Sequence, residues 1–153
     1  MMTIERYRQD MAPALLDVFY TSVLQGCKHH YSAKQLAAWA PESIDIKGFE
    51  EKMDALQPLI ARLDSKIAGY ADLQPSGLID HFFVHGHCQK KRVGSALMHA
   101  LLNMGANLPL LYSHVSLTAK PFFEQNGFNV VKQQTVNVNG VDLENYYMKR
   151  PQH

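Results

Sequence analysis

Apolar residues recur with a helical period in the segment that follows Arg92. They are separated by steps of three and one, which keeps them on one helical face, and they fall at Val93, Ala96, Leu97, Ala100, Leu101 and Met104. The preceding segment, 78–84, is short, apolar and rich in aromatic and branched residues, as is typical of a mostly buried strand. The pattern therefore predicts a strand, a basic loop and a helix, in that order.

Helix caps and turn residues predict the elements on either side of this unit. Ser32-Ala33-Lys34-Gln35 has the form of a capping box, in which the Ser and Gln side chains bond free backbone groups at a helix start. Asn139-Gly140 favours a type I′ turn and is the strongest hairpin signal in the chain. In chain order, we expect a strand over 3–8, helices over about 13–25, 32–40 and 49–56, a hairpin over 59–73, a strand over 110–116, a short helix over 118–127 and a hairpin over 128–149.

The composition is that of one compact domain. The chain has 153 residues, of which 46% are hydrophobic and 19% charged, and we expect a single domain over residues 2–150. A net charge of +1 gives no general reason to expect binding to nucleic acid or to an anionic membrane. No apolar run approaches the roughly 18 residues of a membrane span. With two cysteines and no visible signal peptide, we expect a cytoplasmic, bacterial-type protein with reduced thiols.

The start of the predicted helix is suited to binding a phosphate. A helix start carries unpaired backbone N–H groups and the positive end of the helix dipole. Small residues at Gly94 and Ser95 let an anion approach the backbone, and Lys90, Lys91 and Arg92 add positive charge. Neither G-x-G-x-x-G nor G-x-x-x-x-G-K-[ST] occurs in the chain, which weighs against a dinucleotide or a nucleoside triphosphate as the ligand.

Two stretches resemble motifs of the GNAT family of N-acetyltransferases. Gln89-Lys90-Lys91-Arg92-Val93-Gly94 resembles motif A, Q/R-x-x-G-x-G/A, and Ala119-Lys120-Pro121-Phe122-Phe123-Glu124-Gln125-Asn126-Gly127-Phe128 resembles motif B, A-x-x-F-Y-E-x-x-G-F. Arg92 stands where the family has its first glycine, so a residue with a side chain must make that turn, at a cost if its φ is positive. The resemblance covers nearly the whole chain and is closest to the small bacterial YafP-like branch.

This resemblance implies both a fold and a donor. The fold is α/β and GNAT-like, with a mixed, mostly antiparallel central sheet flanked by helices. The donor is acetyl-CoA or another acyl-CoA, whose pyrophosphate binds the motif A backbone and whose pantetheine arm pairs with the preceding strand. By position, the residues that bind the donor are Phe82, Phe83, Val84, Gln89, Lys90, Lys91, Arg92, Val93, Gly94, Ser95, Ser116, Phe122 and Phe123. Without the resemblance, the motif A stretch is a solvated basic loop before a core helix.

Asp80 is the candidate general base. The acceptor in this family is normally an amine, and a lysine-like amine with a pKa of about 10.4 must lose a proton before it attacks the thioester. Asp80 lies among apolar residues of the predicted strand, where partial desolvation makes a carboxylate a better base. The alternative is a structural hydrogen bond or salt bridge. Strict alternation turns His81 to the opposite face, unless a β-bulge, common in this strand of the family, cancels that inference.

The general acid of the family is a tyrosine of motif B, whose place is taken here by Phe123. Either Tyr112, Tyr146 or Tyr147 protonates the departing thiolate, with Tyr112 as our candidate, or the thiolate leaves unassisted, which a thiol with a pKa of about 8.5 tolerates. Ser116 stands where many members carry an asparagine near the pantetheine, so its hydroxyl is a candidate for catalysis as well as for donor binding. Capping of the following helix is the alternative.

Eight histidines raise the question of a metal site. His81, His85, His87 and Cys88 lie close together, but no second Cys or His pair has ligand spacing, and we expect no metal. Trp39 lies in the early helices, which in the family overlie the acceptor groove, and it either shapes that pocket or anchors the core. Cys88 is not expected to carry an acyl group, because direct transfer needs no enzyme nucleophile.

Two functions are compatible with these residues. The first is an N-acetyltransferase that moves the acetyl group of acetyl-CoA to a primary amine by direct attack in a ternary complex. The alternative, motivated by Phe123 and Arg92, is a non-catalytic acyl-CoA-binding or partner-binding module. Nucleic acid and membranes are not expected as partners, since no long basic face is present. The acceptor stays open, and the final hairpin offers an edge through which two copies can form a homodimer.

Overall fold

The computed structural model describes residues 1–152 and contains two four-stranded sheets. The first has the strand order β1 (Met2–Arg6), β2 (Leu59–Leu63), β3 (Lys66–Ala71) and β5 (Phe82–Val84); the second has the order β4 (Leu78–Ile79), β6 (Leu110–Ser116), β8 (Val141–Pro151) and β7 (Asn129–Val138). Within the described residues, β4 and β6 are parallel and the other strand pairs are antiparallel. The expected α/β fold with a mixed, mostly antiparallel sheet is confirmed.

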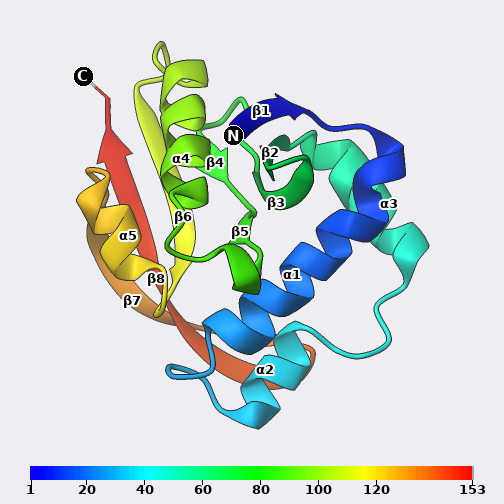
Figure 1. Cartoon of the computed structure of the whole chain (residues 1–153). Helices are drawn as coiled ribbons and strands as arrows, with labels where there is room; N and C mark the ends of the chain where they lie inside the picture. The colour runs from blue at the N-terminus through cyan, green and yellow to red at the C-terminus, as the bar shows by residue number, and fades with distance from the viewer. Residues whose placement is uncertain (153) are drawn as a thin grey trace.

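Helices cover both sides of the sheets (Figure 1). On one side lie α1 (Ala12–Gly26), α2 (Ala33–Trp39) and α3 (Ile46–Leu56); on the other lie α4 (Val93–Met104) and α5 (Lys120–Gln125), and short 3-10 turns are η1 (Gln9–Met11) and η2 (Gly86–Cys88). Alternation along β2 and β3 separates two cores, because Ile60 and Tyr70 pack with α1 and α3 whereas Ala61 and Ala71 pack with α4. The sheets are thus enclosed between two apolar layers.

The capping and turn signals are confirmed. Ser32 Oγ accepts a hydrogen bond from the N–H of Gln35 at 3.1 Å, and Gln35 Oε1 accepts one from the N–H of Ser32 at 2.9 Å. Asn139 and Gly140 both have positive φ, 49° and 85°, as a type I′ turn requires. Of the helices described, none is both long enough and apolar enough to cross a membrane.

The strand expected over 78–84 is divided in two. β4 ends at Ile79, where it is paired with β6, and β5 begins at Phe82, where it is paired with β3. Asp80 and His81 lie between the two strands. The chain passes from one sheet to the other at this break, so β5 and β6 have no rungs between them beyond it. Simple alternation therefore does not place the side chains of Asp80 and His81.

Candidate functional site

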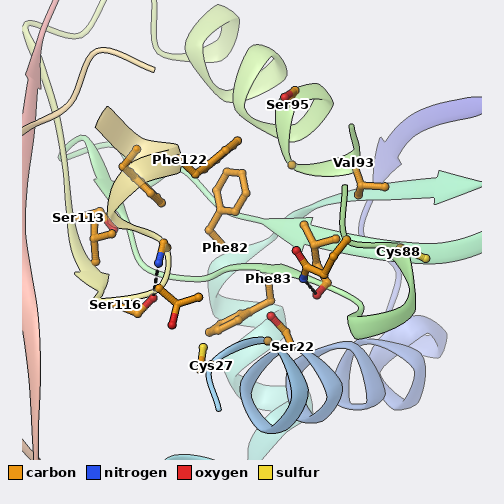
Figure 2. A pocket seen from close by; sticks show the side chains of 18 of the residues that line it. Ser22, Cys27, Phe82, Phe83, Cys88, Val93, Ser95, Ser113, Ser116 and Phe122 are labelled. Atoms are coloured by element: carbon orange, nitrogen blue, oxygen red, sulfur yellow. Dashed lines mark hydrogen bonds between the residues drawn. The ribbon is translucent and has the colours of Figure 1, made fainter. Parts of the chain in front are cut away.

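A groove of about 480 Å³ opens where β5 and β6 separate. It is bounded by the start of α4, by α5 and by the C-terminal end of α1 (Figure 2). Of the residues predicted to bind the donor, all except Lys91 line this groove. Of the catalytic candidates, Asp80 and Ser116 line it and Tyr112 does not. The structure therefore brings most of the predicted site residues together in one place.

The groove edge of β5 carries free backbone groups. Phe83 is paired with Tyr70 of β3. Two residues to either side, the N–H of His85 donates to the carbonyl of Ala68 and the carbonyl of His81 accepts the N–H of Asp72. Because hydrogen-bonded pairs alternate in an antiparallel ladder, Phe83 also turns its N–H and C=O toward β3. By alternation, Phe82 and Val84 turn theirs toward the groove. Gln89 Nε2 donates to the carbonyl of Val84 at 2.9 Å, which leaves the groups of Phe82 for a ligand. An extended chain with amide groups can pair with such an edge.

The start of α4 has a strained backbone at the position where motif A has a glycine. Arg92, where motif A has a glycine, is the N-cap residue with φ 65°, and Lys90 has φ 64°. A non-glycine residue in this left-handed region costs on the order of 1 kcal/mol. A Cβ placed at Gly94 lies 3.4 Å from the ring of Phe122, which is ordinary van der Waals contact, so packing against α5 does not by itself require glycine here. The loop thus presents two cationic side chains beside the first N–H groups of α4.

Phenylalanine rings form the wall of the groove between β5 and α5 (Figure 2). The ring centroid of Phe82 lies 5.5 Å from that of Phe122 and 5.7 Å from that of Phe123. Phe123 is almost fully buried and packs edge-on against Phe128 at 5.0 Å. The motif B position that carries a hydroxyl in the family is therefore part of the apolar core here.

Asp80 lies at the mouth of the groove and forms an ion pair. Its Oδ2 accepts a hydrogen bond from Lys52 Nζ of α3 at 2.8 Å. The two side chains remain 35% and 48% exposed, respectively, so the carboxylate is accessible from solvent as well as from the groove. Both sequence interpretations of Asp80 are compatible with this geometry, since the salt bridge is present and a surface pair of this kind separates easily.

His81 packs away from the groove among aromatic rings. Its ring centroid lies 6.1 Å from that of Phe19 and 5.3 Å from that of Phe83. Burial lowers the pKa of His81 to about 4. Burial also raises the pKa of Tyr70 well above its usual value, so the Tyr70 hydroxyl stays protonated. It donates a hydrogen bond to Nδ1 of His81 at 3.0 Å. His81 is thus a neutral, structural side chain beneath the groove.

The tyrosines considered as proton donors are not in the groove. The Tyr112 hydroxyl donates to Ser76 Oγ at 3.4 Å, and the ring of Tyr112 packs edge-on against Tyr147. Lys120 Nζ lies 5.2 Å from the ring centre of Tyr146. Among the described residues, the groove lining contains no tyrosine. The structure therefore does not bring Tyr112 to Asp80 and the donor-binding residues.

Hydroxyl groups and one thiol line the end of the groove near α1. Ser116 Oγ accepts a hydrogen bond from the N–H of Ala119 at 3.0 Å, which closes the turn before α5. Ala119 is the N-cap residue of α5 and the helix has no side-chain capping bond, so Ser116 does not take the capping role that was its alternative. Cys27, the residue after α1, lines the same groove as Ser116 (Figure 2). Burial raises the pKa of the Cys27 thiol, and a hydrogen bond with Thr118 opposes this in part. No sequence signal pointed to Cys27, because it lies far from both motifs.

The structure also shows where Trp39, His85 and His87 lie. Trp39 lines the groove and packs against Tyr31, so it belongs to both the pocket and the core. The rings of His85 and His87 are stacked 5.3 Å apart, and His85 Nε2 contacts Asp17 Oδ2 at 3.0 Å. Over residues 1–152, no group of three His, Cys, Asp or Glu side chains is arranged to hold a metal ion.

Comparison with known proteins identifies the class. The family model described as an acetyltransferase (GNAT) domain matches residues 27–150. The chain therefore belongs to the GNAT family of acetyltransferases. It is 34% identical over 151 residues, 98% of this chain and 97% of the relative, to the uncharacterized N-acetyltransferase YafP of Escherichia coli K12. The family resemblance and its YafP-like character are confirmed.

Solved structures show the same fold. A GCN5-related N-acetyltransferase from Rhodopseudomonas palustris has a TM-score of 0.92 and 28% identity, with 97% of this chain and 94% of that chain covered. YncA of Salmonella typhimurium, an acetyltransferase solved with its cofactor acetyl-CoA, has a TM-score of 0.71 and 18% identity, with 100% of this chain and 95% of that chain covered. The second likeness concerns the fold alone.

Proposed function

We propose that this protein transfers an acetyl group from acetyl-CoA to a primary amine, by direct attack of the amine in a ternary complex. The observation that supports this most is the single groove in which the backbone edge of β5, the start of α4 and the Asp80 carboxylate meet. Family membership supports the reaction class. We further propose that residues 2–150 act as one domain, in the cytoplasm and without a metal.

The donor lies along β5 and reaches the start of α4. Its pyrophosphate accepts hydrogen bonds from the first N–H groups of α4, with Lys90 and Arg92 supplying positive charge. Its pantetheine arm pairs with the groove-facing backbone of Phe82, while the ring of Phe122 covers the apolar part of the arm. These contacts use mostly backbone atoms, so they do not depend on the first glycine of motif A.

The acceptor enters beside Asp80. The carboxylate takes a proton from the ammonium group, directly or through a water, and the freed lone pair attacks the thioester carbonyl carbon. The new C–N bond forms, the nitrogen of the tetrahedral intermediate loses its second proton to solvent, the C–S bond breaks, and CoA leaves as a thiolate. Since no tyrosine lines the described groove, the thiolate departs unassisted and is protonated by solvent, which its pKa of about 8.5 permits.

One observation favours a second function. Phe123 is buried in the core and cannot donate a proton, which is the feature expected of a non-catalytic acyl-CoA-binding module on the same fold. The two functions differ in their products. The enzyme releases free CoA thiol in the presence of an amine, whereas the module is stabilised by acetyl-CoA without turnover.

Thermal unfolding with and without acetyl-CoA tests the donor site. At a hundred times its dissociation constant, acetyl-CoA is expected to stabilise the fold by about 2.7 kcal/mol. In Gly94→Glu, a carboxylate at the start of α4 repels the pyrophosphate and the shift is lost. The control is Asn103→Glu, which adds the same charge to the exposed end of α4 and keeps the shift.

Release of CoA thiol in the presence of a panel of primary amines then separates the two functions. Turnover with any amine supports the enzyme. Stabilisation without turnover across the panel supports the module. The absence of a thermal shift in the wild-type protein contradicts acetyl-CoA as the ligand and leaves a shared fold only.

A further inference from the structure

A buried carboxylate lies at the point where the two sheets separate. Asp72 follows β3 directly and is only 1% exposed. Its Oδ1 accepts the backbone N–H of His81 at 2.6 Å, and its Oδ2 accepts Gln74 Nε2 at 2.7 Å and, more weakly, the backbone N–H of Asp80 at 3.4 Å. All three donors lie within ten residues of Asp72 along the chain. The carboxylate of Asp72 thus accepts the backbone N–H groups of both Asp80 and His81, the two residues between β4 and β5.

The register of the parallel ladder between β4 and β6 shows which hydrogen bond is missing at His81. The N–H of Tyr112 donates to the carbonyl of Gly77 at 2.9 Å, and the last rungs between β4 and β6 involve Ile79. Parallel rungs recur every two residues, so the next rung would join the N–H of His81 to the carbonyl of His114. The backbone of His81 faces β3 instead, because its carbonyl accepts the N–H of Asp72 at 3.2 Å and its N–H donates to the Asp72 carboxylate. The ladder ends there, and the carbonyl of His114 is left on the groove side, where His114 lines the cavity.

The charge of Asp72 is held by hydrogen bonds alone. In the part of the chain that the structure describes, no Lys, Arg or His side chain forms an ion pair with it. Burial raises the pKa of Asp72, and the hydrogen bonds from Gln74, His81 and Asp80 oppose that rise. Burying a carboxylate without a cation is unfavourable for folding unless several N–H groups surround it. A residue that only filled space here would cost less if it were apolar.

We propose that Asp72 is the positioning residue of this break: its carboxylate, together with its own backbone N–H, keeps the backbone of His81 turned toward β3 and fixes the backbone of Asp80 at the groove mouth. The inference rests on the proposed function, because the groove beside the break is the one assigned to acetyl-CoA. When the carboxylate is replaced by a side chain without an acceptor, the N–H groups of Asp80 and His81 lose their partner and the edge of the groove is no longer held in one position.

The test compares Asp72→Leu with Tyr70→Phe. Leucine is similar in size to aspartate but has no hydrogen-bond acceptor. Tyr70 is buried at the same break, does not line the groove and donates its hydroxyl to Nδ1 of His81 at 3.0 Å, so its replacement removes a neighbouring buried hydrogen bond without touching the His81 N–H. Calorimetric titration with acetyl-CoA is expected to show at least tenfold weaker binding for Asp72→Leu and a change under threefold for Tyr70→Phe, at a temperature where both variants are folded.

Equal affinity of wild type and folded Asp72→Leu overturns the inference while leaving the proposed function intact. Failure of the wild type to bind acetyl-CoA instead contradicts the proposed function itself. If Asp72→Leu does not fold, NMR of the wild type decides. The backbone amide proton of His81, bonded to a carboxylate, is expected far downfield and to stay there when acetyl-CoA is added. The inference is contradicted if the His81 amide proton has an ordinary chemical shift, or if its chemical shift becomes ordinary when acetyl-CoA is added.

Discussion

The two halves of the groove are built in different ways. The half beside α4 and α5 comes from three short segments, residues 82–84, 89–95 without Lys91, and 122–123, and it presents backbone groups, apolar rings and the side chains of Lys90 and Arg92. The half beside α1 and α2 comes from side chains of distant segments, among them Cys27 and Trp39. Backbone groups stay the same when side chains are substituted, so the half beside α4 and α5 is suited to binding a ligand that does not vary. The second half can change with each side chain, as an acceptor site must.

Asp80→Asn tests this separation with the largest expected effect. A positioned general base contributes roughly 100- to 10,000-fold to a rate, and an amide cannot take the proton. We expect amine-dependent CoA release to fall at least about 100-fold with acetyl-CoA affinity unchanged. The measurement is steady-state kinetics with any amine that the wild type acetylates, together with calorimetry. A parallel loss of acetyl-CoA affinity indicates that the two halves are one unit.

Acid unfolding affects both halves at once, because His81 lies beneath β5. The pKa of His81 falls from its usual 6.5 to about 4 through burial, so the folded protein resists a proton that the unfolded chain accepts. Stability is therefore fully present above pH 6.5 and is lost as the pH falls toward 4, by up to about 3 kcal/mol.

Urea unfolding at a series of pH values measures this loss. The matched variant is His81→Gln, which keeps a side-chain acceptor for the Tyr70 hydroxyl but does not titrate. We expect the difference in stability between wild type and His81→Gln to shrink between pH 6.5 and 4. A difference that is constant over this range shows that His81 is not the buried neutral group described above.

Arg92→Gly has a smaller effect, confined to the half beside α4. Glycine removes the strain of φ 65° but adds freedom to the unfolded chain, so we expect a gain of at most about 1 kcal/mol. Lys91→Gly is the control, because it removes the same charge from the same loop at a residue whose φ is not positive, and we expect it to lose about 0.5–1 kcal/mol. Denaturant melts of the two variants give the difference, and equal changes exclude strain at Arg92.

The sequence predicted the half beside α4 because its signals are local. The helical period and the basic loop lie within one stretch of chain, and each motif is itself a short run of residues. The missing glycine at Arg92 marked where a positive φ would carry a cost, and the structure has a positive φ there. The capping box and the type I′ turn were predicted for the same reason. The family resemblance added the donor, which the pattern of residues by itself did not specify.

The other half depended on contacts between distant residues. Cys27 reaches the groove only because α1 ends there, and the pairing of Asp80 with Lys52 joins residues 28 apart in the chain. Asp72 gave no signal, since its role depends on how the backbone of residues 80 and 81 turns toward β3. Tyr112 was a reasonable candidate by distance along the chain, but its side chain points to Ser76. Such placements depend on packing, not on local pattern.

Lys52→Met gives the smallest expected effect. An exposed ion pair contributes about 0.2–1 kcal/mol, so the stability of the variant should stay within about 1 kcal/mol of the wild type. Lys52 lies at the mouth of the groove and competes with a cationic acceptor for Asp80, so the KM for the amine should fall a few-fold while acetyl-CoA affinity stays constant. The dependence of the amine KM on salt concentration measures the same competition, because salt screens the exposed pair of Lys52 and Asp80 and weakens it. A rise in the amine KM instead assigns Lys52 to the acceptor, as a partner for an anionic group, and the half beside α1 and α2 then binds an acceptor of mixed charge.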